Sequence, residues 1–327
     1  MWGRRAARGG TELNGCRLLS RKVCRSWNPA LTVLALFHLS GCEPPAPEGA
    51  SDGARGAPPL PAGTVADAVW PVVLVDAGGR PHNFTMPPAR ILSLVPSANA
   101  VLLALGEGKR LVGRTDFDTA GAVAHLPSVG GGLGPDMETV LDLRPDLVIR
   151  FAGPSDADTP ARLDRAGVAH FAVQPDGIED VRGIVRQLGA LTGRGSAADS
   201  LVARIDSVLA DVRARVAVLP PVRTAFVLGG RPPWVAGPGS FIDEVLRAAG
   251  GVNVFADLDR LYAPVDPEEL VAREVDVFLT SPGVAIDARL VEGVPLRVVH
   301  AQLEIPGPEL GEAAVAVARA LHPEAFP

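Results

Sequence analysis

A long amphipathic segment in the middle of the chain constrains its fold more than any other feature. Residues 196–216 carry an apolar side chain every three or four positions, the period of one helix face; these are Leu201, Ile205, Val208, Leu209, Val212 and Val216. Ser196 and Asp199 resemble a capping box, and Pro220 ends the helix. Because segments of similar pattern flank it, the helix is predicted either to bridge two lobes or to pack as an ordinary core helix.

Apolar strand-like runs alternate with helical segments on both sides of this helix. Before it we expect a hairpin over 72–86, strands over 91–95, 111–113 and 146–151, and helices over 99–105 and 137–143. After it we expect strands over 224–228 and 275–279 and helices over 241–249 and 266–272. This alternation predicts parallel sheets with ligand sites at the carboxyl ends of their strands. The predicted fold class is α/β, with two Rossmann-like lobes of parallel sheet joined by a single long helix.

The two halves of the chain also resemble each other at a fixed offset of 130 residues. Glu138 aligns with Glu268, Asp146 aligns with Asp276, and the strand-like run 147–149 aligns with 277–279. The match indicates that the two lobes are copies of one unit.

The amino terminus has the features of a lipoprotein precursor. A basic lead precedes an apolar run over 29–39, which is too short to span a bilayer but is typical of a signal peptide. The residues Leu39-Ser40-Gly41-Cys42 resemble a bacterial lipobox, so we expect cleavage before Cys42 and lipidation of its thiol; the alternative is a secretory signal with a chance cysteine. The expected organisation is a signal peptide (1–41), a Pro/Ala/Gly-rich tether (42–68), a first lobe (69–190), a bridging helix (191–221) and a second lobe (222–327).

Composition and missing motifs argue against several classes of function. The first 41 residues hold seven of the 31 basic residues and one of the 37 acidic residues, which leaves 24 basic and 36 acidic residues in the body. This negative balance argues against a nucleic-acid partner. Cysteine occurs only at positions 16, 24 and 42, so the mature body has no Cys nucleophile and no Cys-ligated metal. Catalytic and nucleotide-binding signatures are also missing, and we expect neither enzyme activity nor a resident cofactor.

Several motifs together resemble the periplasmic binding proteins for vitamin B12, haem and ferric siderophores. They are RILSLVPS at 90–97, ALG at 104–106, LPSVGG at 126–131, PDLVI at 145–149, DPEEL at 266–270, IPGP at 305–308 and ALHP at 320–323. The resemblance covers about residues 72–326. It implies a monomer with two α/β lobes bridged by one rigid helix. Such a protein binds a bulky metal chelate in the cleft between its lobes and delivers it to the membrane subunits of an ABC importer.

The resemblance also assigns roles to individual residues. In cobalamin-binding members a surface Glu on each lobe docks against Arg residues of the membrane subunits, and the motif match places these residues at Glu138 and Glu268. Both lie in the first turn of a predicted helix, where a carboxylate also stabilises the helix dipole. Ligand contacts are expected from loops after the strands, at Ser97, Asn99, Asp116, Phe117, Phe151, Arg231, Trp234, Arg260 and Tyr262. Ser97 follows a strand as a nucleophile would, but no Gly-x-Ser-x-Gly surrounds it, and the preceding Pro96 favours a helix-capping role instead.

The sequence departs from the cobalamin-binding members in ways that leave the cargo open. A Glu frequent in their first helix is Ala100 here, and the last cleft loop reads His300-Ala301-Gln302-Leu303 without their Asp-Trp pair. A corrinoid and a ferric siderophore are therefore expected equally, with haem behind them; Tyr262 and His300 are the candidate haem ligands. The alternative classes are a lipoprotein that senses its ligand without transport and an enzyme on the same scaffold.

Overall fold

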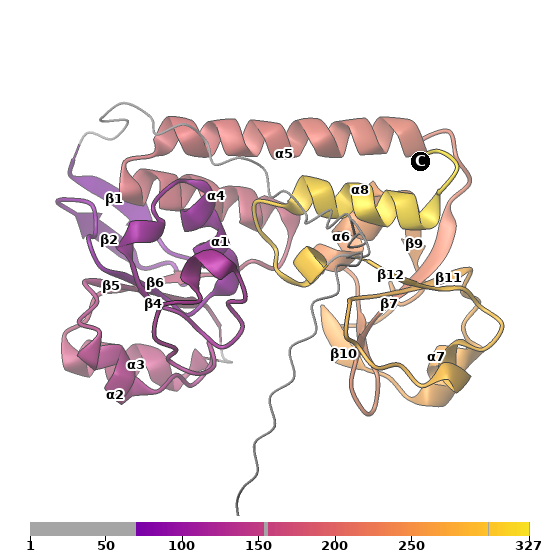
Figure 1. Ribbon diagram of the computed structural model, residues 1–327, viewed down its shortest axis with the longest axis horizontal. Helices are drawn as coiled ribbons and strands as arrows, with labels where there is room; N and C mark the ends of the chain where they lie inside the picture. The colour runs from indigo at the N-terminus through magenta and orange to yellow at the C-terminus, as the bar shows by residue number, and fades with distance from the viewer. Residues whose placement is uncertain (1–69, 154–155, 300, 327) are drawn as a thin grey trace, which may run out of the picture. The chain divides into compact units, whose positions relative to one another are not determined.

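The computed structural model describes residues 70–153, 156–299 and 301–326, which belong to one compact unit (Figure 1). The expected signal peptide, the lipidation site Cys42, the tether over 42–68 and His300 lie outside the described residues. Within those residues, no helix combines the length and the apolar character needed to cross a membrane.

The first lobe is built around a parallel sheet with the strand order β4-β3-β5-β6. Its strands are β3 (Ile91–Ser93), β4 (Leu111–Gly113), β5 (Leu147–Phe151) and β6 (His170–Val173). Its helices are α1 (Pro96–Ala104), α2 (Met137–Asp142), α3 (Asp158–Ala166) and α4 (Ile178–Thr192), and an antiparallel hairpin of β1 (Val72–Val75) and β2 (Pro81–Phe84) precedes them. The hairpin, strands and helices expected before residue 151 are all present.

Alternate residues of these strands face two different helical layers. Ile149 and Phe171 belong to the buried cluster that contains side chains of α1 and α4. Val148 belongs to a second cluster, together with Val140 of α2 and Leu163 of α3. Because successive side chains of a strand point to opposite faces, the sheet is covered by helices on both sides (Figure 1).

The second lobe contains a mixed sheet, with the strand order β10-β8-β7-β11-β12 and with β9 also paired to β7. The strands are β7 (Val222–Gly229), β8 (Trp234–Ala236), β9 (Gly251–Asn253), β10 (Tyr262–Pro264), β11 (Val277–Thr280) and β12 (Leu296–Val298); the helices are α6 (Phe241–Ala248), α7 (Pro267–Ala272) and α8 (Leu310–Leu321). The expectation of a wholly parallel second sheet was wrong, because β8 pairs antiparallel with β7 and β10. The connection from Gly229 to Trp234 is too short for a crossover between parallel strands.

The long helix α5 extends over Gly195–Val216 and buries the predicted apolar face. Leu201, Ile205, Leu209, Val212 and Val216 are buried, and Val208 is partly buried. The predicted capping box was wrong, because α5 starts one residue earlier and the residue at its N-cap position is Arg194. Ser196 therefore lies inside the first turn, and the Asp199 carboxylate lies 3.6 Å from Nε of Arg186 on α4.

Helix α5 packs on α4 and α8 through positions where one partner is glycine. A Cβ atom added to Gly189 of α4 would lie 2.4 Å from the Cβ of Ala198, and one added to Gly311 of α8 would lie 3.0 Å from the Cβ of Val208. This close packing extends one cluster of buried side chains from the first sheet through α4, α5, α6 and α8 to the second sheet. Both interpretations of the helix hold, because α5 bridges the lobes and is also part of their common core (Figure 1).

The internal repeat seen in the sequence corresponds to one repeated structural unit. The carboxylate of Asp146 accepts hydrogen bonds from the backbone N–H groups of Ala89 and Arg90, at the start of β3. The carboxylate of Asp276 accepts a hydrogen bond from the backbone N–H of Arg223, at the start of β7. In each lobe the aspartate thus joins two adjacent parallel strands, β3 with β5 and β7 with β11.

The common core predicts that truncation of one α5 side chain destabilises the whole folded unit. Leu209 is fully buried, and Leu209→Ala is expected to lower the free energy of unfolding by about 2–5 kcal/mol. Val218→Ala, at a position that is 86% exposed, should change it by less than about 0.5 kcal/mol. Urea unfolding followed by circular dichroism measures both variants, and equal effects would contradict a buried role for this helix face.

Candidate functional site

A pocket of about 480 Å³ lies at the carboxyl end of β7. It is lined by Leu228, Gly229, Gly230, Trp234, Ile242, Tyr262 and Glu304. Trp234 is 44% exposed, so part of its ring is available to a bound molecule. A Cβ atom on Gly230 would lie 2.9 Å from this ring, and Gly230 has a φ of +95°, so the turn that holds the tryptophan needs glycine. The pocket thus offers an aromatic surface where strands of an α/β sheet end, the usual place for a ligand.

Tyr262 contributes a phenol that keeps its proton. It lies in β10 opposite Ala236 of β8. Burial, together with the negative charges of Asp176 and Glu304, raises the pKa of Tyr262 to about 12. Asp176 belongs to the segment between β6 and α4, so charges from both lobes act on this one hydroxyl group. At neutral pH the phenol is a hydrogen-bond donor rather than a phenolate.

An adjoining pocket of about 700 Å³ contains the predicted Arg231. It shares Leu228, Gly229 and Gly230 with the first pocket. Its other lining comes from Val227, Pro232, Pro233, Pro267, Val284, Ala285, Ile286, Asp287 and Leu290, so the segment after β11 contributes to it. Arg260 lines neither pocket; it is exposed, with its Nε 3.6 Å from the carboxylate of Asp259.

Ser97 and Asn99 lie in the first turns of α1 and are buried. The capping alternative for Ser97 was wrong, because α1 begins at Pro96 and its N-cap residue is Val95. Within the described residues, Ser97 Oγ and Asn99 Oδ1 are buried atoms without a hydrogen-bond partner. The Asn99 amide donates to the Asp118 carboxylate at 2.8 Å, and Asp118 also accepts from Thr115. Asn99, Asp118 and Thr115 thus form a local network after β3 and β4, next to the two buried oxygen atoms without partners.

The remaining predicted residues of the first lobe differ in their exposure. Asp116 is exposed and accepts a hydrogen bond from Ser128 Oγ at 2.6 Å. Phe117 is 64% exposed. Phe151 is partly buried, and a Cβ atom on Gly132 would lie 3.3 Å from its ring. Of the nine predicted ligand residues, the described pockets bring together Trp234 and Tyr262, with Arg231 next to them.

Sequence reasoning missed the acidic residues near Tyr262. Glu304 directly follows the loop 300–303 that drew attention through its missing Asp-Trp pair, and Asp176 follows β6. Position after a strand is the only signal that could have pointed to Asp176. Nothing in the local sequence distinguishes Glu304 from an ordinary surface glutamate.

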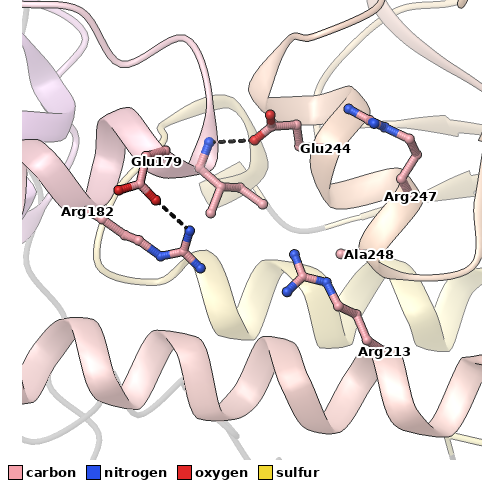
Figure 2. A pocket seen from close by; sticks show the side chains of 7 residues that line it. Glu179, Arg182, Arg213, Glu244, Arg247 and Ala248 are labelled. Atoms are coloured by element: carbon pink, nitrogen blue, oxygen red, sulfur yellow. Dashed lines mark hydrogen bonds and ion pairs between the residues drawn. The ribbon is translucent and has the colours of Figure 1, made fainter.

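A third pocket, of about 430 Å³, lies where α4, α5 and α6 meet (Figure 2). Glu244 of α6 accepts a hydrogen bond from the backbone N–H of Ile178 at 2.6 Å, so a carboxylate of the second lobe satisfies the first turn of α4. Arg182 pairs with Glu179 of α4 and with Asp206 of α5. Glu244 thus links α6 to α4, and Arg182 links α4 to α5, while Arg213 and Arg247 also line the pocket (Figure 2).

The two predicted docking residues lie on α2 and α7. Glu138 follows the N-cap residue Asp136, whose carboxylate accepts from the Glu138 backbone N–H. Glu268 follows the N-cap residue Asp266 and Pro267. Both glutamates are exposed, and neither has an ion-pair partner among the described residues.

The unusual pKa of Tyr262 can be measured directly, because it is the only tyrosine in the chain. We expect its phenolate absorbance to appear near pH 12 rather than near the ordinary tyrosine pKa of about 10. Between these values the unfolded chain has released the proton and the native state has not, so stability should fall as the pH rises above about 10. A spectrophotometric titration, with circular dichroism to verify folding and Tyr262→Phe as blank, measures this; a midpoint near 10 in folded protein would contradict it.

The chain matches known proteins across most of the described residues. The family model for periplasmic binding proteins matches residues 91–290. The vitamin B12-binding protein of Vibrio cholerae is 26% identical over 196 residues, which are 60% of this chain and 71% of that protein. An uncharacterized ABC transporter substrate-binding lipoprotein of Bacillus subtilis is 26% identical over 266 residues, 79% of this chain and 81% of that one. The structure of a periplasmic heme binding protein from Pseudomonas aeruginosa, 25% identical, aligns with a TM-score of 0.64 over 72% of this chain and 93% of that chain. This chain therefore belongs to the periplasmic binding protein family, whose members are binding proteins of transport systems and not enzymes.

Proposed function

We propose that this protein captures a metal chelate, a corrinoid or a ferric siderophore, and delivers it to an ABC importer. The observation that carries the proposal is the pocket with Trp234 and Tyr262 at the carboxyl end of β7, in a chain of the periplasmic binding protein family. An aromatic face and a protonated phenol suit the flat apolar surface and the polar edge of such a chelate. The similar proteins include ones named as vitamin B12-binding and heme-binding, which supports this class of cargo.

We rank haem behind the other two cargoes, and the chemistry of the pocket supports this ranking. Ferric haem that is held by a tyrosine needs the phenolate form of that tyrosine. Burial and nearby acidic groups raise the pKa of Tyr262, which disfavours the phenolate. His300, the other candidate haem ligand, lies outside the described residues.

The amino terminus supports anchoring to a membrane through lipids on Cys42. The lipobox-like residues 39–42 follow an apolar run, and the Bacillus subtilis relative is named a lipoprotein. Two or three acyl chains hold a protein firmly on a bilayer, because each buried CH₂ contributes about 0.8 kcal/mol. The Pro/Ala/Gly-rich tether over 42–68 would then connect the anchor to the two lobes and the helix between them.

Delivery is proposed to use Glu138 and Glu268 as a pair of docking carboxylates. They occupy equivalent places on α2 and α7, one in each lobe, and both are exposed. An arginine on each of two membrane subunits is the complementary group, because guanidinium and carboxylate form paired, charge-assisted hydrogen bonds.

A calorimetric titration tests the cargo. A soluble form that starts at Glu43 is expected to bind cyanocobalamin one to one, with a Kd below about 1 µM. Trp234→Ala should raise this Kd at least about tenfold by removing the aromatic surface. Trp70→Phe, which alters the other tryptophan of the body, should leave it unchanged.

The outcomes of this titration differ in meaning. No heat with cyanocobalamin but binding of a ferric siderophore would assign the second cargo, and binding of haem alone would correct the ranking. If the folded protein bound none of the three, the proposed function would be wrong.

The docking pair is tested by reversing its charge. Glu138→Arg with Glu268→Arg should reduce uptake of the bound chelate into cells by about tenfold or more, since like charges then face each other across the interface. Affinity for the chelate, measured by calorimetry, should not change. Glu312→Arg with Glu292→Arg serves as a control with the same change in charge at exposed positions elsewhere on the surface, and normal uptake by the docking variant would exclude the proposed contact.

A further inference from the structure

The surface around the two proposed docking carboxylates is repeated with unusual fidelity between the lobes. When residues 138–149 are aligned with residues 268–279, each position has the same burial class in both lobes. The match includes buried Val140 and Leu270, which attach α2 and α7 to their sheets, and the exposed carboxylates two residues before them. These two segments therefore expose equivalent positions to solvent.

This repeated surface contains an exposed aliphatic side chain in each lobe. Leu141 is 41% exposed and Val271 is 59% exposed. Each lies three residues after the docking glutamate of its helix, on the same side of the helix. One exposed aliphatic residue needs no explanation, but here two lie at equivalent positions, each beside a carboxylate that has no ion-pair partner among the described residues, and this pattern favours a binding surface.

We propose that Leu141 and Val271 are apolar docking contacts that act together with Glu138 and Glu268. This inference rests on the proposed delivery to an ABC importer. The partner it commits to is a pair of equivalent membrane subunits, each with an apolar side chain next to an arginine. Charge complementarity supports this partner, because the surfaces on α2 and α7 are acidic and a basic group is needed to neutralise them.

The physical role of the aliphatic residues is to exclude water from the ion pairs. An exposed ion pair contributes little in water, whereas the same pair is stronger when apolar groups around it remove the solvent. Interface residues that contribute most are usually surrounded by contacts of this kind. Contacts of Leu141 and Val271 with the membrane subunits would also keep Glu138 and Glu268 aligned with the arginines of those subunits.

Site-specific cross-linking tests the proposal. The form that starts at Glu43 has no cysteine, so Leu141→Cys and Val271→Cys each introduce the only thiol, which is then labelled with a maleimide benzophenone. The labelled proteins are irradiated with membrane vesicles of the native host, and the adducts are identified by mass spectrometry. Glu138→Cys and Glu268→Cys report on the carboxylates, and Val298→Cys, at a position that is 62% exposed on β12, is the matched control.

We expect adducts with membrane subunits of an ABC importer from positions 141 and 271, with at least about tenfold less from position 298. The same adducts should fall about tenfold when Glu138→Arg and Glu268→Arg are added to the Leu141→Cys or Val271→Cys protein. Importer adducts from 138 and 268 without adducts from 141 and 271 would overturn this inference alone. If none of the four positions gave importer adducts, the docking proposal itself would fail, and equal labelling from 298 would show that the contact is not specific.

Discussion

The packing of α5 between α4 and α8 is the interaction on which the rest of the structure depends. Two glycines, Gly189 and Gly311, let these helices approach closely. As a result one cluster of buried side chains continues from the first sheet to the second. A shared core of this kind resists relative movement of the two lobes, because interiors are close-packed and moving one lobe would open cavities. The Glu244 carboxylate adds a direct hydrogen bond from the second lobe to the start of α4.

A rigid connection between the lobes has a consequence for binding. The pocket beside Trp234 is then present before the cargo arrives, and little affinity is lost in ordering the protein. A pocket that exists before the ligand binds also has an energetic cost, because its buried polar groups lose contact with water without gaining contacts to a ligand. Tyr262 shows this, since its pKa is raised by burial and by acidic groups from both lobes. Ser97 Oγ and Asn99 Oδ1, buried without partners in the described structure, show it in the first lobe.

Much of the fold could be predicted from the sequence because its signals are local and periodic. The buried face of α5 follows from residue spacing alone. Asp146 and Asp276 reveal the repeated unit because each carboxylate accepts a backbone hydrogen bond at the start of the neighbouring strand. The antiparallel strand β8 was missed. The short connection from Gly229 to Trp234 indicates an antiparallel pair, but only when the end of β7 at Gly229 is already known. Ser196 was wrongly predicted as the N-cap residue of α5. Helix α4 ends at its C-cap residue Gly193, and α5 begins directly after it with Arg194 as N-cap residue.

The candidate site was harder to predict than the fold, because it is assembled from distant segments. Trp234 and Tyr262 were expected on loops after strands, but each is the first residue of a strand, and they share a pocket. Glu304 and Asp176 matter only because they lie near the Tyr262 hydroxyl in three dimensions. Arg260 had the same kind of sequence position as Tyr262 but lies outside the described pockets. The ends of predicted strands therefore give a set of candidate ligand residues, but the tertiary structure decides which of these candidates line a pocket.

The measurement that tests the shared-core account most directly is the distance between the lobes with and without cargo. Asp142→Cys and Ala272→Cys place spin labels at equivalent exposed positions on α2 and α7, in a body without other cysteines. Double electron–electron resonance is predicted to give one narrow distance distribution that hardly shifts when a bound chelate is added. A broad distribution, or a shift of more than about 10 Å of the kind that hinge closure produces, would contradict the rigid connection between the lobes.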